Sequence, residues 1–266
     1  MRGALIALGV TAVLAGSATF AAAGAPAPIE HQPVVGPVWK PHVAAARRYA
    51  RQRAGGVAFA FIDWWGHMHR FHARRTFPTA SVIKVMLLAA YLRQPGVRHR
   101  RLHDADRALL RPMIRRSDNS AATAVRNIVG QARIVRLARR ARMRDFHYSS
   151  IWGLSRTSPR DQARFMYRLE RYIPRRHRRF ALRQLAHVVG WQRWGIGKVA
   201  PPGWALYFKG GWGSGTGWMD HQVSLLKRNS LRMSLAVFTS FDPSHAYGKQ
   251  TLRGVAARLL RGLPPG

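Results

Sequence analysis

The chain has no cysteine among its 266 residues. This absence excludes a disulfide framework, a lipid-modified cysteine anchor, and any thiolate nucleophile or thiolate metal ligand. Stability must therefore come from a packed core, and a hydrophobic content of 47% is enough to build one.

Acidic residues are also scarce. The chain carries 45 Lys and Arg against ten Asp and Glu, for a net charge of +35, and its only glutamates are Glu30 and Glu170. Such a charge attracts polyanions. The basic residues are scattered along the chain, so either incidental surface charge or weak association with an anionic cell-wall polymer is consistent with them. No nucleic-acid motif with defined spacing is present, so no specific nucleic-acid partner is expected.

The N-terminal apolar run, residues 4–14, is too short to span a bilayer. It follows a positive start and precedes three small alanines, which predicts a signal peptide over residues 1–25. A proline-rich linker over residues 26–39 then leads to one domain over residues 40–266. We expect a secreted, extracytoplasmic protein of the cell envelope, monomeric, with no transmembrane segment in the mature chain.

The hydrophobic periodicity of the mature chain predicts a mixed order of helices and strands. Helices are expected over residues 40–53, 81–93, 158–172, 180–189 and 244–261, and over most of 104–144, broken at residues 117–119 and 130. Strands are expected over residues 57–64, 67–73, 204–209, 222–226 and 232–240, and an irregular loop over 146–157. The order predicts an α+β fold: an antiparallel sheet flanked by N- and C-terminal helices, with an inserted all-helical lobe.

Ser81 and Lys84 open the apolar helix expected over residues 81–93. Positions three apart lie on one face of a helix, so the lysine amine can reach the serine hydroxyl. Serine becomes a nucleophile when a base removes its proton, and a lysine whose pKa is lowered by burial can be that base. The same spacing recurs at Ser224 and Lys227, but in an expected strand, where such positions face opposite ways.

Two further segments are weak signals when taken alone. Ser117-Asp118-Asn119 lies at a break between helices, where all three residue types are common helix caps. Lys209-Gly210-Gly211 ends an expected strand, as an ordinary glycine turn would.

Together and in this order, the three segments resemble those of class A β-lactamases and penicillin-binding transpeptidases. The resemblance covers roughly residues 40–260, and Thr157-Ser158-Pro159 is similar to the family's helix start after its omega loop. It implies a serine hydrolase acting on an amide, small-molecule or peptide, with no metal and no cofactor. It also implies three catalytic roles: Ser81 as the nucleophile that forms an acyl-enzyme, Lys84 as the base, and Ser117 as the proton shuttle to the leaving nitrogen.

The resemblance also implies how substrate is held. Asn119 would bind the substrate amide and Lys209 would supply positive charge near a substrate carboxylate. The backbone N–H groups of Ser81 and Trp212 would form the oxyanion hole. The expected substrate-binding residues are Asn119, Lys209, Gly210, Gly211 and Trp212.

Three departures from the family pattern leave the activity open. Gly210 stands where the family has a hydroxyl side chain, the stretch between Lys84 and Ser117 is short, and the loop over 146–157 has no glutamate to activate water. Asp145 and His147 lie near that loop without matching the glutamate. A β-lactamase, a D,D-peptidase, a diverged hydrolase and a non-catalytic wall-binding module remain alternatives.

Overall fold

The computed structural model describes residues 39–213 and 218–264. The predicted signal peptide and all of the predicted linker except Trp39 lie outside these residues. Within the described part of the chain, no helix is long and apolar enough to cross a membrane.

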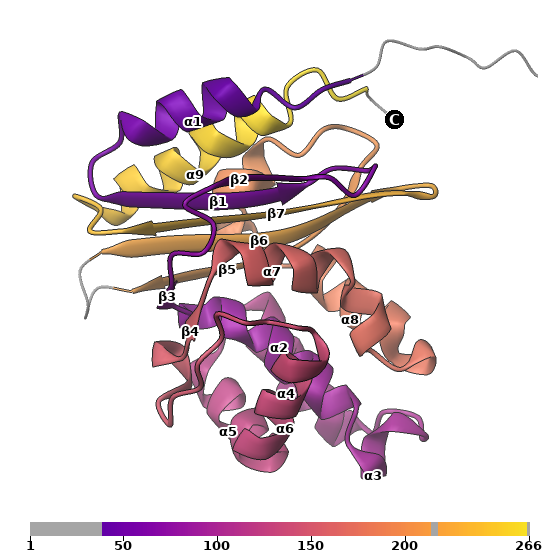
Figure 1. The fold of residues 1–266 in the computed structure, drawn as a ribbon. Helices are drawn as coiled ribbons and strands as arrows, with labels where there is room; N and C mark the ends of the chain where they lie inside the picture. Colours follow the sequence, from indigo (N-terminus) through magenta and orange to yellow (C-terminus); the bar gives the residue numbers. More distant parts are fainter. Residues whose placement is uncertain (1–38, 214–217, 265–266) are drawn as a thin grey trace, which may run out of the picture. The chain divides into compact units, whose positions relative to one another are not determined.

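A five-stranded antiparallel sheet forms the centre of the fold (Figure 1). Its strand order is β2-β1-β7-β6-β5. β1 pairs with β7 from Gly56 opposite Ser240 to Ile62 opposite Ser234, so strands from the N-terminal and C-terminal parts of the described domain meet in one sheet. The strands are β1 (Gly56–Ile62), β2 (Met68–Phe71), β5 (Ala205–Gly213), β6 (Met219–Arg228) and β7 (Leu231–Ser240).

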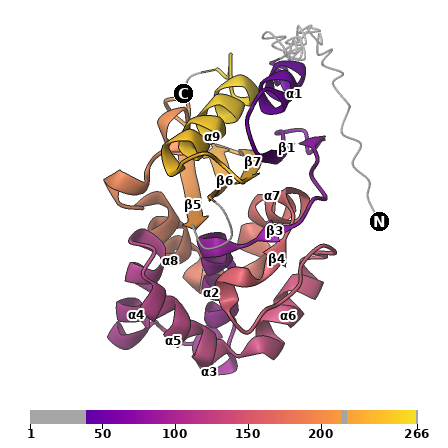
Figure 2. The same cartoon turned by 90° about the vertical axis from the view of Figure 1, so that its left-hand side faces the viewer.

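Helices cover both faces of the sheet (Figure 2). α1 (Val43–Arg51) and α9 (His245–Leu259) lie side by side on one face, and α7 (Pro159–Tyr167) lies against the other. β1 is buried along its whole length because its side chains alternate between two cores. Phe59 and Phe61 join the core under α1 and α9, whereas Ala60 and Ile62 join the core shared with the helical lobe.

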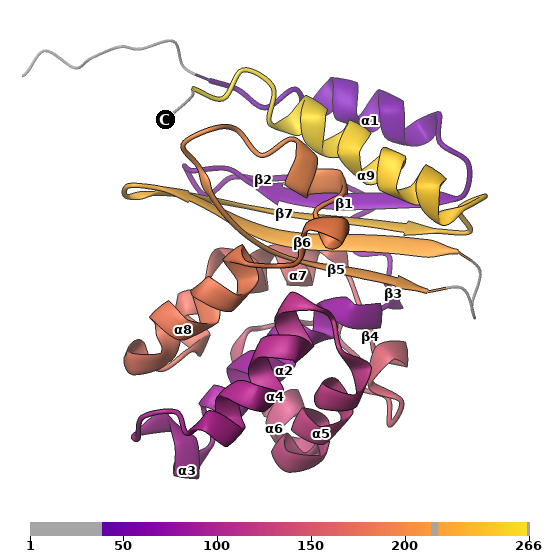
Figure 3. The ribbon, with the colours of Figure 1, turned by 180° about the vertical axis from the view of Figure 1, so that it is seen from behind.

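The inserted helical lobe lies beyond α7, on the side of the sheet away from α1 and α9 (Figure 3). All ten residues of α2 are buried, because the other helices of the lobe surround it; this explains its apolar sequence. The α+β fold with an inserted all-helical lobe is confirmed. The lobe helices are α2 (Ile83–Leu92), α3 (Pro95–Arg98), α4 (Asp104–Arg115), α5 (Asn119–Val129), α6 (Gln131–Arg140) and α8 (Arg175–Ala186).

Several boundaries differ from those expected. A 3-10 turn, η1 (Ala80–Val82), precedes α2, so Ser81 lies just before the α-helix and not in its first turn. Pro95 opens the short helix α3, since proline suits the first helical position. The two-residue strands β3 (Phe77–Pro78) and β4 (Arg156–Thr157) pair with each other and are too short to show a periodicity in sequence.

The glycine-rich segment over residues 210–217 follows the strand that the sequence predicts over residues 204–209. Its first four residues instead continue β5 to Gly213, and the remaining residues, 214–217, lie outside the described part. β5 therefore extends beyond the predicted end at residue 209. Glycines within a strand are typical of a place where another backbone approaches closely. That approach involves the turn carrying Ser81.

Candidate active site

Ser81 lies in the 3-10 turn between β3 and α2, and the chain before it is tightly held. The buried Thr79 donates its backbone N–H to Ser155 O at 2.6 Å, and its hydroxyl reaches Trp152 O at 3.2 Å. Ala80 has a φ of 43°, a left-handed conformation that costs a non-glycine residue on the order of 1 kcal/mol. A strained turn of this kind fixes the position of the next residue, Ser81.

The amine of Lys84 is held by the segment between α4 and α5. Its Nζ donates to Ser117 O at 2.6 Å, Asn119 Oδ1 at 2.7 Å and Ser117 Oγ at 3.2 Å. The side chain is fully buried. Burial lowers the pKa of Lys84 to about 7, against a smaller opposing effect of the Asp118 carboxylate. Lys84 therefore has an amine that is partly neutral near pH 7, as a general base requires.

The three residues of the segment 117–119 have different contacts. Asp118 is a helix cap, since its Oδ1 accepts the backbone N–H of Ala121 at 2.7 Å at the start of α5. Ser117, with a left-handed φ of 60°, and Asn119 both turn toward Lys84. Asp118 is therefore the helix cap, whereas Ser117 and Asn119 contact the amine of Lys84.

Lys209 comes from β5, one of the two edge strands of the sheet. Its Nζ donates to Ser117 Oγ at 3.0 Å and to Gly210 O at 2.7 Å. The side chain is fully buried, and burial together with the nearby Lys84 lowers the pKa of Lys209 well below its ordinary value. The structure thus joins three expected site residues, Lys84, Ser117 and Lys209, around one hydroxyl oxygen.

Gly211 is where β5 meets the turn that carries Ser81. A Cβ at this position would lie 2.8 Å from Ser81 N and 3.0 Å from Val82 N. These are backbone atoms, so a side chain at residue 211 would force the strand and the turn apart. Gly211 therefore lets the strand bring Trp212 close to Ser81, as an oxyanion hole made from the N–H groups of Ser81 and Trp212 requires.

Gly210 faces a tryptophan that the sequence did not connect with it. A Cβ at residue 210 would lie 3.1 Å from Cζ2 of Trp194. The ring of Trp194 packs edge-on against Trp212 with centroids 6.0 Å apart, and Trp191 meets Trp212 at 6.1 Å. Trp194 is buried, whereas Trp191 is 67% exposed. Trp194 thus packs within the core, whereas Trp191 lies at the surface beside Trp212.

The loop over residues 146–157 presents an indole to Lys84 instead of a carboxylate. Lys84 Nζ lies 5.0 Å from the ring centroid of Trp152, and Trp152 Nε1 donates to Thr123 Oγ1 at 3.1 Å. Trp152 could not be predicted as a site residue from the sequence, because its contact with Lys84 depends on the folding of distant segments. Its place in a loop that lacks glutamate was the one available signal.

Asp145, the carboxylate nearest to that loop in sequence, already accepts hydrogen bonds from other side chains. It is buried, and its Oδ2 accepts the Ser158 hydroxyl at 2.7 Å and Arg160 Nη2 at 2.9 Å. His147 is exposed. Glu170 forms ion pairs with Lys227 at 3.0 Å and with Arg232 at 2.7 Å, so this carboxylate is also held by basic side chains.

In the part of the chain that the structure describes, the Ser81 hydroxyl makes no hydrogen bond, and no group of three or more His, Asp or Glu side chains is placed to hold a metal ion. The second Ser-x-x-Lys segment lies in β6: Ser224 donates to Leu235 O, and Lys227 pairs with Glu170. Of the two Ser-x-x-Lys segments, the one at Ser81 and Lys84 is therefore the candidate catalytic pair.

Comparison with solved structures identifies proteins of the same fold. A β-lactamase from Sphaerobacter thermophilus is similar at 22% identity with a TM-score of 0.71, over 85% of this chain and 98% of that one. A β-lactamase from Xanthomonas campestris matches at 15% identity and a TM-score of 0.70, over 83% and 96% of the chains. A class A β-lactamase from Mycobacterium abscessus matches at 17% and 0.67, over 83% and 98%. No curated protein matches the chain.

A family model described as the β-lactamase enzyme family matches residues 106–263, more than half of the chain. The match begins after Ser81 and Lys84 and includes residues 117–119 and 209–211. The chain belongs to the β-lactamase enzyme family, and it is a serine hydrolase of the type that acts on amide bonds.

Proposed function

We propose that Ser81 attacks an amide of a cell-envelope substrate and forms an acyl-enzyme, with Lys84 as the general base. The observation that carries this proposal is the buried Lys84 amine, held by Ser117 and Asn119, with a pKa lowered to about 7. A purely structural lysine would gain from a carboxylate partner, which keeps the amine charged. Lys84 is instead surrounded by neutral oxygens, which leave it able to take a proton.

Acylation then follows from the residues already described. The Ser81 Oγ–H proton passes to Lys84 Nζ as Oγ bonds to the substrate carbonyl carbon, and the carbonyl oxygen becomes an oxyanion. The N–H groups of Ser81 and Trp212 would stabilise that oxyanion. Ser117, which accepts from Lys84, would then deliver the proton to the nitrogen as the C–N bond breaks.

Release of the acyl group lacks a dedicated base. Water must be deprotonated to attack the ester, and the loop over residues 146–157 offers Trp152 near Lys84 where a glutamate would serve. Asp145 is held by Ser158 and Arg160. We therefore place a class A-type β-lactamase with fast turnover second to a slow acyl-enzyme-forming hydrolase.

Gly210 and Trp194 bear on the substrate. The side-chain hydroxyl that relatives are expected to use for a substrate carboxylate is missing, and Trp194 occupies the space beside the glycine. Lys209 Nζ remains, 5.9 Å from the Trp212 ring centroid. We infer a substrate amide flanked by a group that packs on an aromatic surface, with weaker carboxylate recognition than in a D,D-peptidase.

Export by a signal peptide over residues 1–25 and association with an anionic wall polymer complete the proposal. The excess of basic residues supports the second. A non-catalytic wall-binding module that keeps the fold is the alternative from another class of function. It has no use for a base with a lowered pKa beside a serine, and this disfavours it.

Two assays on the wild type and Ser81→Ala separate these functions. A fluorescent penicillin should label the wild type and not the variant, while nitrocefin turnover should be slow in the wild type and absent in the variant. Rapid nitrocefin turnover that depends on Ser81 would establish a β-lactamase instead. Equal absence of labelling by fluorescent penicillin and by a panel of serine-reactive amide and ester probes would favour the binding module.

A further inference from the structure

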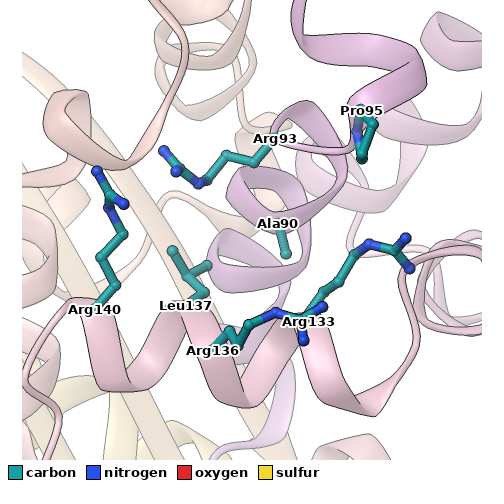
Figure 4. Close-up of a pocket in the computed structure, with 7 residues that line it drawn as sticks. All are labelled: Ala90, Arg93, Pro95, Arg133, Arg136, Leu137 and Arg140. Carbon is teal, nitrogen blue, oxygen red and sulfur yellow. The ribbon is translucent and has the colours of Figure 1, made fainter.

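Four arginines on two helices of the lobe line a pocket of about 400 Å³ (Figure 4). Arg93 comes from the end of α2, and Arg133, Arg136 and Arg140 project from α6. The floor includes Ala90 and Leu137, and Arg93 and Arg140 lie toward one side while Arg133 reaches toward Pro95. The pocket is far from Ser81: the 12 residues from Ser81 to Arg93 span about 18 Å at 1.5 Å per residue.

This pocket continues into two others along the lobe. A pocket of about 500 Å³ shares Arg93, and one of about 320 Å³ shares Arg176 with the second. We call this series the arginine track. Its nine arginines are Arg93, Arg98, Arg101, Arg107, Arg133, Arg136, Arg140, Arg175 and Arg176.

The charges of the arginine track are almost unopposed. Among the described residues, Arg107 is the one member within 4.0 Å of a carboxylate, that of Asp104. Burial and the neighbouring cations Arg140 and Arg98 lower the pKa of Arg93. Gathering cations without carboxylates is unfavourable, and a bound anion would relieve the repulsion.

We propose that the arginine track binds a linear polymer of the cell envelope, not a nucleic acid, that carries a phosphate group on each repeat unit. Guanidinium groups match phosphate as paired donors, and a phosphate has enough acceptor oxygens to meet several arginines at once. A chain fits better than a single small anion, because three pockets follow one another through the shared residues Arg93 and Arg176.

The shape of the track favours a polymer over a membrane surface. Its guanidinium groups line concave pockets, and its apolar members Leu137, Leu102 and Phe180 are buried or half-buried, so they have little area to insert into lipid. The inference extends the envelope-polymer association proposed above, but it uses neither Ser81 nor its chemistry. The two proposals can therefore fail separately.

The test compares two triple variants with equal loss of charge. Arg133→Gln, Arg136→Gln and Arg140→Gln together alter the track. Arg48→Gln, Arg253→Gln and Arg261→Gln alter three exposed arginines on the α1 and α9 side of the sheet. Binding of fluorescent inorganic polyphosphate to the full chain is measured by anisotropy over a range of salt concentrations, with Ser81→Ala as a catalytic control.

We expect the track triple to bind polyphosphate at least about tenfold more weakly than the wild type. Its slope of log Kd against log salt should become shallower by about 3, one unit for each lost phosphate contact. The control triple and Ser81→Ala should stay within about twofold of wild-type affinity. Thermal melts establish that each variant is folded, and Arg93→Gln alone serves if the track triple does not fold.

Three results would overturn the inference. Equal weakening in both triples would mean that net charge alone attracts the polymer. Equal affinity for polyglutamate would remove the preference for phosphate. Tighter binding at the same salt to duplex DNA, or to vesicles containing phosphatidylglycerol, would assign the track to nucleic acid or to a membrane surface.

Discussion

The Trp152 ring lies over the amine of Lys84, with 5.0 Å between Nζ and the ring centroid. The loop that approaches the candidate base therefore brings an apolar surface and no acid. Two steps of the proposed reaction are affected differently, because acylation needs one base and release needs a second.

We predict that a penicillin forms a long-lived adduct with Ser81. General-base help for the attacking water is worth about 10² to 10⁴ in rate, and its absence should leave the adduct intact for minutes or longer. Intact-mass spectrometry after mixing measures the adduct directly, and Ser81→Ala should show none. Fast turnover of the penicillin without a visible adduct would mean that another group activates water.

The pH dependence of acylation should report the Lys84 amine. The neutral form accepts the proton, so the acylation rate should rise with pH through a midpoint near 7, where the pKa of Lys84 lies. At one pH unit below the midpoint the rate should be about a tenth of its plateau.

Asn119→Asp makes this prediction specific to Lys84. It places a carboxylate where Asn119 Oδ1 now accepts from Nζ at 2.7 Å, and a negative charge at that distance raises the pKa of the amine by about 1 or more. The midpoint of labelling should move to higher pH. An unchanged midpoint in Asn119→Asp would show that a different group controls acylation.

Gly211→Ala should disable the site through the backbone. Its Cβ would lie 2.8 Å from Ser81 N, so the strand and the turn must separate, at a cost of about 1 to 3 kcal/mol in unfolding free energy. The displaced oxyanion hole should lower the acylation rate by about 10² or more.

Gly213→Ala is the matched control on the same strand. Its Cβ would meet Met219 Cε at 3.2 Å, the movable end of a flexible side chain. Labelling rates and denaturant unfolding of both variants test the difference. Equal effects of the two substitutions would mean that the close approach to Ser81 has no special role.

Asp220 should make stability depend on pH. Burial, with a smaller contribution from Asp242, raises the pKa of Asp220 to about 8, and its Oδ2 is buried without a hydrogen-bond partner among the described residues. Its Oδ1 lies 2.6 Å from Nδ1 of His245, but burial lowers the pKa of His245, so a charged imidazole does not offset this shift. The folded state then binds a proton that the unfolded state has lost between about pH 4 and pH 8, so this group lowers stability as pH rises through that range.

Asp220→Asn imitates the protonated acid and should remove that dependence. Relative to wild type, its unfolding free energy should increase by about 4 kcal/mol between pH 5 and pH 8.5, at about 1.4 kcal/mol for each pH unit up to the pKa of Asp220. Asp104→Asn, whose side chain is fully exposed, should show no such change. Denaturant unfolding at both pH values gives the comparison; parallel behaviour of the two variants would contradict the assignment.

Much of the fold follows from local sequence, because it depends on periodicity and caps. The α7 start is an example: Ser158 accepts from Asp161 N and Pro159 takes the first helical position, as expected. α8 begins at Arg175, five residues before the start that the sequence predicts at residue 180, because its first turn is basic and half-exposed and shows little apolar periodicity.

The site could be predicted as a set of segments but not as an arrangement. The order of the three segments marked Ser81, Lys84, Ser117 and Lys209, and the structure brings the last three together. The contacts of Trp152 with Lys84 and of Trp194 with Gly210 depend on packing between distant parts of the chain, which no local pattern encodes.

Ser117 Oγ accepts hydrogen bonds from both Lys84 and Lys209. A hydroxyl oxygen has two lone pairs, and the two amines engage both when Lys84 and Lys209 are protonated. The hydrogen of Ser117 is therefore left with a single direction, away from the lysines. Once Lys84 has taken the Ser81 proton, the Ser117 hydroxyl can no longer rotate freely, so the leaving nitrogen would meet a hydrogen that already points away from both lysines.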